Sequence, residues 1–152
     1  MSRIRVLLVG ENADFLRGAS DWLVSESNVD FVGAAASGAE AIDLAGRLEP
    51  DVVVMDESVS DMKTPEVVRR VKSLRTAPRV VLLSFLDGGA TRQIAAATGA
   101  DGVVAKARFT AALLPAIYEV LGGSSLPPAR GSVRSKSTLP ISTKDEITRS
   151  ES

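Results

Sequence analysis

The chain has 152 residues and a formal net charge of −1 at pH 7, with 45% hydrophobic and 24% charged residues. This composition fits one globular domain, and the near-zero charge argues against a nucleic-acid-binding protein of the usual basic kind. Cysteine and histidine are both absent, which excludes disulfides, thiolate metal sites and phosphohistidine on this chain. No run of about 18 apolar residues indicates a membrane span, and the N-terminus does not resemble a signal peptide, so we expect a cytoplasmic protein without a membrane partner.

Five apolar runs, rich in valine and leucine, predict the strands of a sheet. They cover residues 6–9, 29–32, 52–55, 80–83 and 103–105. Three of these runs are continuously hydrophobic, which is typical of strands that are covered on both faces.

A helix is predicted after each of these runs. The apolar residues of the first, such as Phe15, Ala19 and Trp22, recur at helical spacing. Pro115 stands inside the last, where proline removes a backbone hydrogen bond, so we expect a kink or an irregular turn there. The five predicted helices cover residues 15–23, 41–48, 65–71, 88–98 and 111–121.

Alternation of five strands with five helices predicts an α/β fold, a doubly wound parallel sheet with helices on both faces. We assign residues 1–123 to this domain. Residues 124–152 contain eleven serines or threonines and three prolines but few large apolar side chains. Such a segment cannot bury enough surface to offset its ordering entropy, so we expect a disordered tail whose deletion hardly changes the melting temperature.

Four residues that suit phosphoryl chemistry stand at the ends of four predicted strands. They are Glu11, Asp56, Ser84 and Lys106. Ligands of an open parallel sheet bind beyond the carboxyl ends of its strands, so two carboxylates, a hydroxyl and an ammonium are expected to converge there. Each residue alone could be an ordinary loop, turn or helix-cap residue. Together and in this order they favour a functional site.

The chemistry of this set predicts phosphoryl transfer to a carboxylate. Asp56 can act as a nucleophile and form an aspartyl phosphate, a transfer that depends on charge neutralisation, usually by Mg²⁺ and a lysine. Glu11 could share the metal with Asp56, because Mg²⁺ prefers one or two carboxylates and several waters. Lys106 would pair with Asp56 at rest. Ser84 would donate its hydroxyl to the phosphoryl oxygens.

Four segments carry a resemblance to a known family. They read IRVLLVGENADFLRG, FVGAAASGAEAIDLAGRLEPDVVVMD, ATGADGVVAK and LLPAIYEVLGG. Over residues 3–123 the chain resembles the receiver domain of two-component response regulators, a five-stranded flavodoxin-like fold, in the subtype usually joined to a helix-turn-helix output domain. The resemblance implies that Asp56 is the phosphoacceptor, Ser84 the switch hydroxyl and Lys106 the lysine that contacts the phosphoryl group.

The resemblance also implies a Mg²⁺ site formed by Glu11, Asp56 and the backbone carbonyl of Ser58. Gly10 stands where the family usually has the first acid of an acidic pair, which removes one carboxylate from this site. We therefore expect weak Mg²⁺ binding that an acid at this position would tighten. Ser60 replaces the usual proline of the loop after the phosphoacceptor.

Three further departures concern the conformational switch of the family. Thr64 stands where glycine is common, Phe85 where a small residue is favoured, and Val103 where a tyrosine or phenylalanine usually couples to the switch hydroxyl. Without a ring at position 103, we expect Phe85 and the turn at residues 87–89, which contains two glycines, to supply the bistable element.

By the same resemblance, the phosphoryl group comes from a partner histidine kinase or phosphotransfer protein, and the signal leaves through an unidentified downstream protein. No periodic segment follows Gly123, so we expect neither a DNA-binding output domain nor an enzymatic effector. The alternative is a pseudo-receiver, an interaction module that is not phosphorylated. Three other classes of protein lack a feature that they need in this sequence. A metal-dependent phosphatase or nuclease would need a second acid where Ser58 stands, and a corrinoid-binding protein would need a histidine. A flavin-binding protein would need a phosphate-binding loop after the first strand.

Overall fold

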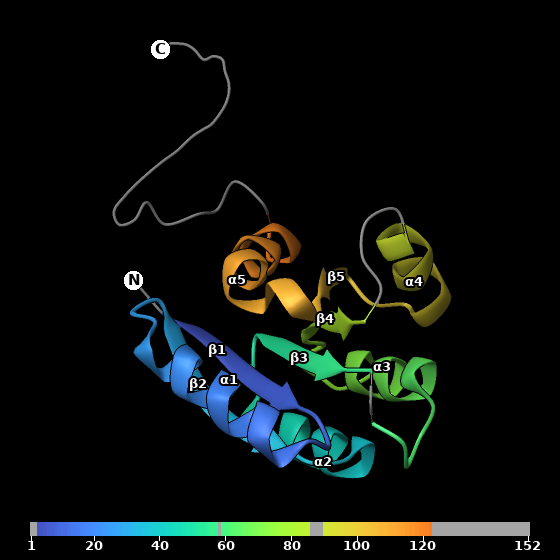
Figure 1. The fold of residues 1–152 in the computed structure, drawn as a ribbon. Coiled ribbons are helices and arrows are strands. Elements are labelled where there is room, and N and C mark those ends of the chain that lie inside the picture. The colour runs from blue at the N-terminus through green and yellow to red at the C-terminus, as the bar shows by residue number, and fades with distance from the viewer. Residues whose placement is uncertain (1–2, 58, 86–89, 123–152) are drawn as a thin grey trace, which may run out of the picture. The chain divides into compact units, whose positions relative to one another are not determined.

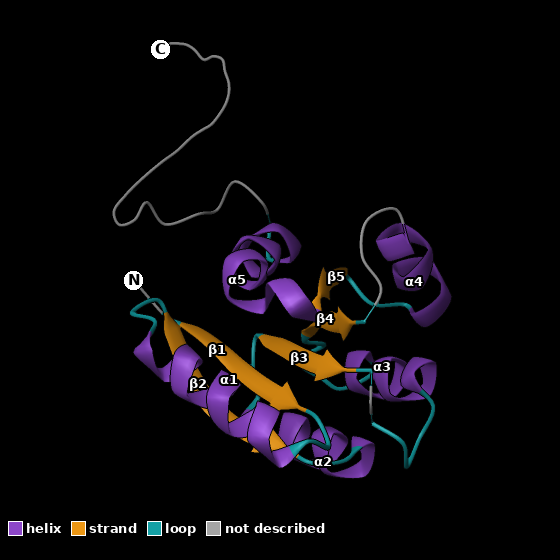
Figure 2. Ribbon diagram, viewed as in Figure 1, coloured by secondary structure: helices purple, strands orange, loops and turns teal. Residues whose placement is uncertain are grey.

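The computed structural model describes residues 3–57, 59–85 and 90–122. Its five strands form one sheet, in which every pair of neighbours is parallel and the order is β2-β1-β3-β4-β5 (Figures 1 and 2). The predicted doubly wound parallel sheet is thus confirmed. The strands are β1 (Ile4–Val9), β2 (Val29–Ala35), β3 (Val52–Asp56), β4 (Arg79–Ser84) and β5 (Gly102–Ala105).

Five helices connect and follow the strands, as predicted. Pro115 lies within the last of them, which continues to Val120, and a 3₁₀ turn at Lys106–Arg108 precedes that helix. None of the described helices is long and apolar enough to cross a membrane. The helices are α1 (Ala13–Ser25), α2 (Gly38–Leu48), α3 (Thr64–Lys72), α4 (Ala90–Thr98) and α5 (Phe109–Val120). The tail predicted at residues 124–152 lies outside the described residues.

Helices cover both faces of the sheet because successive strand side chains point to opposite faces. On one face, Leu7 and Met55 pack with Val67 in a core beneath α2 and α3. On the other face, the buried side chains of Leu23 in α1 and Leu113 in α5 complete a second layer. Such two-sided burial explains why the strands read as continuous apolar runs.

Polar caps fix where the helices next to the site begin. The side chain of Asn12 accepts a hydrogen bond from the backbone N–H of Phe15 and so caps α1, which begins at the next residue. Ser37 caps α2 in the same way. Gly38 follows it where a Cβ would lie 2.8 Å from Cγ2 of Val67, so only glycine lets α2 approach α3 this closely.

Candidate functional site

The register of the sheet brings the candidate residues to its carboxyl edge. Val9 pairs with Met55, Asp56 with Leu83, and Ser84 with Ala105. Asp56 and Ser84 are the last residues of β3 and β4, and Glu11 follows the last residue of β1 by two positions. Lys106 follows Ala105 directly, in the 3₁₀ turn before α5.

Asp56 and Lys106 form an ion pair at this edge. The Lys106 Nζ lies 2.5 Å from Oδ2 of Asp56, whose side chain is 0% exposed, whereas that of Lys106 is 22% exposed. Burying a carboxylate is costly unless a charge and hydrogen bonds compensate it. The lysine supplies that charge from a more open position, so the pair combines a buried carboxylate with a cation that can reach solvent.

Two aromatic rings flank the same ammonium group. The Lys106 Nζ lies 4.3 Å from the ring centroid of Phe15 in α1 and 5.0 Å from that of Phe85 after β4. Cations within about 6 Å of a ring centroid are attracted by the negative face of the ring. Phe15 is fixed in turn by Phe109, whose ring meets it edge-on at 5.7 Å, and Phe109 meets Trp22 at 5.1 Å.

The other candidates surround this pair at different depths. Ser84 is fully buried at the end of β4. Glu11 is exposed in the loop after β1, where its Oε2 accepts hydrogen bonds from both the backbone N–H and the hydroxyl of Ser60, each at 2.6 Å. A proline, usual at position 60, could donate neither bond. Ser58 lies outside the described residues.

The donor set suits a hard cation such as Mg²⁺, which takes oxygen ligands and keeps several waters. Asp56 and Glu11 provide two carboxylates on neighbouring strand ends. Among the residues that the structure describes, no group of three or more acids, histidines or cysteines gathers. A Cβ at Gly10 would lie 3.4 Å from Cβ of Asp56, an ordinary contact, so an acid would fit there. These residues therefore fit a cation that takes two carboxylates from the protein and its other ligands from water.

The loop that carries Ser60 is tied to α2 by Asp61. Its carboxylate accepts hydrogen bonds from the backbone N–H groups of Gly38 at 2.7 Å and Ala39 at 3.1 Å. These two bonds lower the pKa of the Asp61 carboxyl below its ordinary value because they favour the charged form. An anion at the first turn of α2 also suits the helix dipole. Asp61 thus anchors the loop between β3 and α3.

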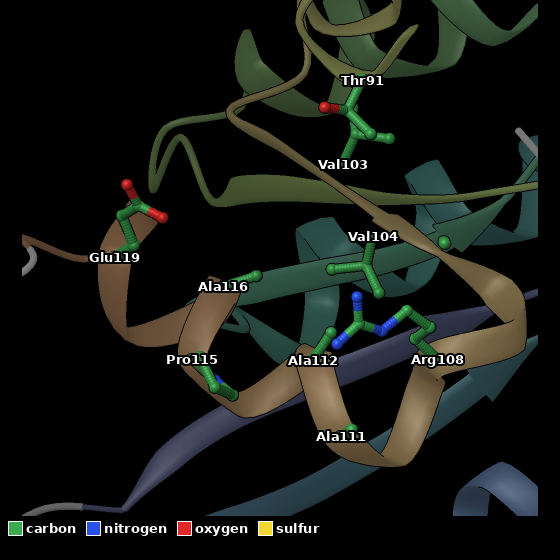
Figure 3. Close-up of a pocket in the computed structure, with 10 residues that line it drawn as sticks. Thr91, Val103, Val104, Arg108, Ala111, Ala112, Pro115, Ala116 and Glu119 are labelled. Carbon is green, nitrogen blue, oxygen red and sulfur yellow. The ribbon is translucent and has the colours of Figure 1, made fainter. Parts of the chain in front are cut away.

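An open groove runs between α4, β5 and α5, with a volume of about 490 Å³ (Figure 3). Small side chains line most of it, among them those of Val103, Ala112 and Ala116, while Arg108 and Glu119 supply the charges. Val103 is also partly buried against the core.

This fold and site can be compared with known proteins. A family model described as the response regulator receiver domain matches residues 6–118. The chain belongs to this family. The predicted family and fold are thereby confirmed, and the site at the carboxyl edge of the sheet belongs to a receiver domain.

Relatives and solved structures agree with this assignment. The chain is 28% identical to the response regulator protein VraR of Staphylococcus saprophyticus over 137 residues, which is 90% of this chain and 65% of the relative. It spans between 23% and 31% of the length of four protein-glutamate methylesterases that also match. A LuxR-family response regulator from Aurantimonas sp. SI85-9A1 superposes with a TM-score of 0.70 at 29% identity, covering 80% of this chain and 87% of that one.

A complex is also among the similar structures. It contains the P1 domain of CheA3 with CheY6 from R. sphaeroides. One chain of this complex superposes on the present chain with a TM-score of 0.60 at 29% identity, and the match covers 70% of this chain and 84% of that one.

Sequence reasoning missed two contacts of the receiver site. Phe15 was expected only as part of the apolar stripe of α1, and its contact with Lys106 depends on how α1 and α5 pack. The bond between Ser60 and Glu11 was missed as well, although the loss of the usual proline marked that position. The bistable element predicted at Phe85 extends into residues 87–89, outside the described residues, and stays a prediction.

Proposed function

We propose that this receiver domain accepts a phosphoryl group on Asp56 from a histidine kinase or a phosphotransfer protein in the cytoplasm. The observation that carries the proposal is the ion pair of the buried Asp56 carboxylate with Lys106. Ser84 directly follows Leu83, the residue that pairs with Asp56 in the sheet. A buried carboxylate with a lysine cation beside it is what nucleophilic attack on phosphorus needs.

The proposed reaction forms one bond and breaks one bond. A carboxylate oxygen of Asp56 attacks the phosphorus of a phosphohistidine on the partner, the P–N bond breaks, and its electron pair leaves with the imidazole, which takes a proton from solvent. The ammonium of Lys106 offsets the negative charge of the phosphoryl oxygens, and the hydroxyl of Ser84 donates a hydrogen bond to one of them. Mg²⁺, when held by Asp56, Glu11 and the Ser58 carbonyl, would supply further charge neutralisation.

Two features support protein partners for this receiver domain. The similar complex from R. sphaeroides joins a receiver-like chain to a P1 domain, so we propose a comparable phosphodonor here. The groove between α4, β5 and α5 offers a surface for a downstream protein (Figure 3). Three of the residues that line it, Val103, Val104 and Ala105, directly precede Lys106 in the chain. The output would then be a change of surface, with no enzymatic step on this chain.

A pseudo-receiver remains the second candidate, and one observation favours it. Gly10 leaves the site with two described carboxylates, Asp56 and Glu11, and Glu11 is already engaged by Ser60. Such a protein would keep the fold and bind partners without being phosphorylated.

Intact-mass measurement with a small phosphodonor decides between the two. Wild type, Asp56→Ala and Asp43→Ala are incubated with Mg²⁺ and acetyl phosphate. Asp43 pairs with Arg47 on the exposed face of α2 and is a matched control. We expect one added phosphate in wild type and in the control, and none in Asp56→Ala. An equal gain in all three would place phosphorylation elsewhere, and no gain in wild type would favour the pseudo-receiver.

A further inference from the structure

Phe85 is an exposed aromatic ring beside a buried ion pair. Its exposed fraction is 70%, and Val24 at 62% is the other large hydrophobic residue that stands out as exposed in the described part of the chain. An exposed apolar side chain is common on protein surfaces. Phe85 differs from Val24 because its ring lies 5.0 Å from the ammonium of Lys106.

A second ring holds the same ammonium from within the domain. Phe15 is partly buried, its centroid lies 4.3 Å from the Lys106 Nζ, and the edge-on contact with Phe109 fixes its orientation. Phe109 follows the 3₁₀ turn that carries Lys106. The lysine and one of its rings are therefore linked through α5, whereas Phe85 reaches the ammonium from β4.

The ammonium of Lys106 thus has three kinds of neighbour: the Asp56 carboxylate and two rings on different elements. A lysine side chain has four rotatable bonds and loses much rotamer freedom when it is held in one place. Attraction to both rings offsets part of that loss, so the cation stays at Asp56 before any phosphoryl group arrives. Positioning of a charged group before the reaction is what electrostatic stabilisation requires.

We infer that Phe15 and Phe85 form an aromatic clamp that positions the Lys106 ammonium over Asp56. Phe15 is the internal half of the clamp and Phe85 the solvent-facing half. Both are positioning residues, since they act on the reacting carboxylate through the lysine. This inference rests on the proposed function only for its effect on phosphorylation, because the position of the lysine can be measured without any phosphodonor.

NMR of the lysine side chains tests the clamp directly. The chain has five lysines, so ¹³C-lysine labelling gives few CεH₂ signals, and the variant Lys106→Arg identifies that of Lys106. Two flanking rings should shift this signal upfield of the others. Lys72, which pairs with Asp101 at 2.7 Å, provides an internal comparison. We expect the upfield shift to shrink in Phe85→Leu and in Phe15→Leu, to persist in Phe85→Tyr, and to stay unchanged in Val24→Ala.

The rate of phosphorylation by acetyl phosphate then shows whether Phe85 positions Lys106 or only obstructs the phosphodonor. Leucine keeps much of the bulk of Phe85 but lacks its ring, so the rate should fall about three- to tenfold in Phe85→Leu and recover in Phe85→Tyr. A faster rate in Phe85→Leu would overturn the clamp, because the ring would then obstruct the donor. A Lys106 signal that overlaps the other lysines in wild type would also overturn it. If no variant is phosphorylated while the shifts behave as expected, the clamp stands and the proposed function fails.

Discussion

The two edges of the sheet use aspartate in different ways. At the amino edge, Asp51 and Asp101 each precede a strand and exchange two hydrogen bonds with a neighbouring strand. The backbone N–H of Arg5 donates to Asp51 at 2.9 Å, and the N–H of Asp51 donates back to the Arg5 carbonyl at 2.8 Å. Asp101 repeats this reciprocal pair with Val80, at 2.8 and 2.9 Å.

At the carboxyl edge, Asp56 pairs with the side chain of Lys106, whereas Asp51 and Asp101 each accept a hydrogen bond from a backbone N–H of a neighbouring strand. The ammonium of Lys106 that pairs with it lies at the end of a flexible side chain, which is partly exposed. A backbone N–H cannot leave its acceptor without disturbing the strand that carries it. A lysine can turn to a new anion while the sheet stays intact. The same residue type therefore locks the fold at one edge and, in the proposed function, takes part in phosphoryl transfer at the other.

Removal of the lysine charge should give the largest effect on the carboxyl edge. In Lys106→Met the stem is kept, but the buried Asp56 loses its cation, so we expect the free energy of unfolding to fall by roughly 3–5 kcal/mol. Phosphorylation by acetyl phosphate should slow about 10²–10³-fold. Urea unfolding and intact-mass time courses measure the two effects. Adding Asp56→Asn to this variant should restore stability without restoring phosphorylation; failure to restore it would assign the loss to packing.

Truncation at the amino edge should affect stability alone. Asp101→Ala leaves the N–H of Val80 without its acceptor and Lys72 without its anion, which should cost about 2–3 kcal/mol. We expect the phosphorylation rate per folded molecule to match that of wild type. A slower rate at full folding would contradict the division of roles between the two edges.

An acid at position 10 would sharpen the comparison by adding charge to the carboxyl edge. In Gly10→Asp the new carboxylate lies beside Asp56, so Mg²⁺ or Mn²⁺ should bind about tenfold more tightly. Without metal the variant should be less stable than wild type, because like charges repel. Gly10→Ala is the control for the change in backbone, since its Cβ makes only ordinary contacts. Calorimetric titration measures the affinity for the metal. Equal affinity in all three proteins would show that the missing carboxylate at position 10 does not limit metal binding.

The smallest effect is expected at Asp61, whose native pKa lies below its ordinary value of 3.8 because Gly38 and Ala39 donate to the charged form. Its contribution to stability is full above pH 3.8 and is lost as the pH falls through the lower native value. Asp61→Asn should therefore lose less stability than wild type between neutral pH and about pH 3. Urea unfolding at the two pH values measures the difference. An equal loss in both proteins would mean that other acids govern acid unfolding.

Much of the fold could be predicted because it depends on periodicity. The apolar runs at residues 52–55 and 80–83 already indicated strands buried on both faces, and parallel topology then brought Asp56 and Lys106 to one edge. The contacts of Phe15, Ser60 and Asp61 could not be predicted in this way. They depend on loop conformation and on the packing of α1 against α5, which no spacing of residues along the chain specifies.

A series of three aromatic rings connects Lys106 to Trp22, whose fluorescence can report on the site. Phe15 contacts the lysine, Phe109 contacts Phe15, and Trp22 contacts Phe109. Trp22 is the single tryptophan of the chain, so its fluorescence arises from one known place. A displacement of Lys106 that disturbs this series would change the emission of Trp22, and events at Asp56 could be followed in unlabelled protein in real time.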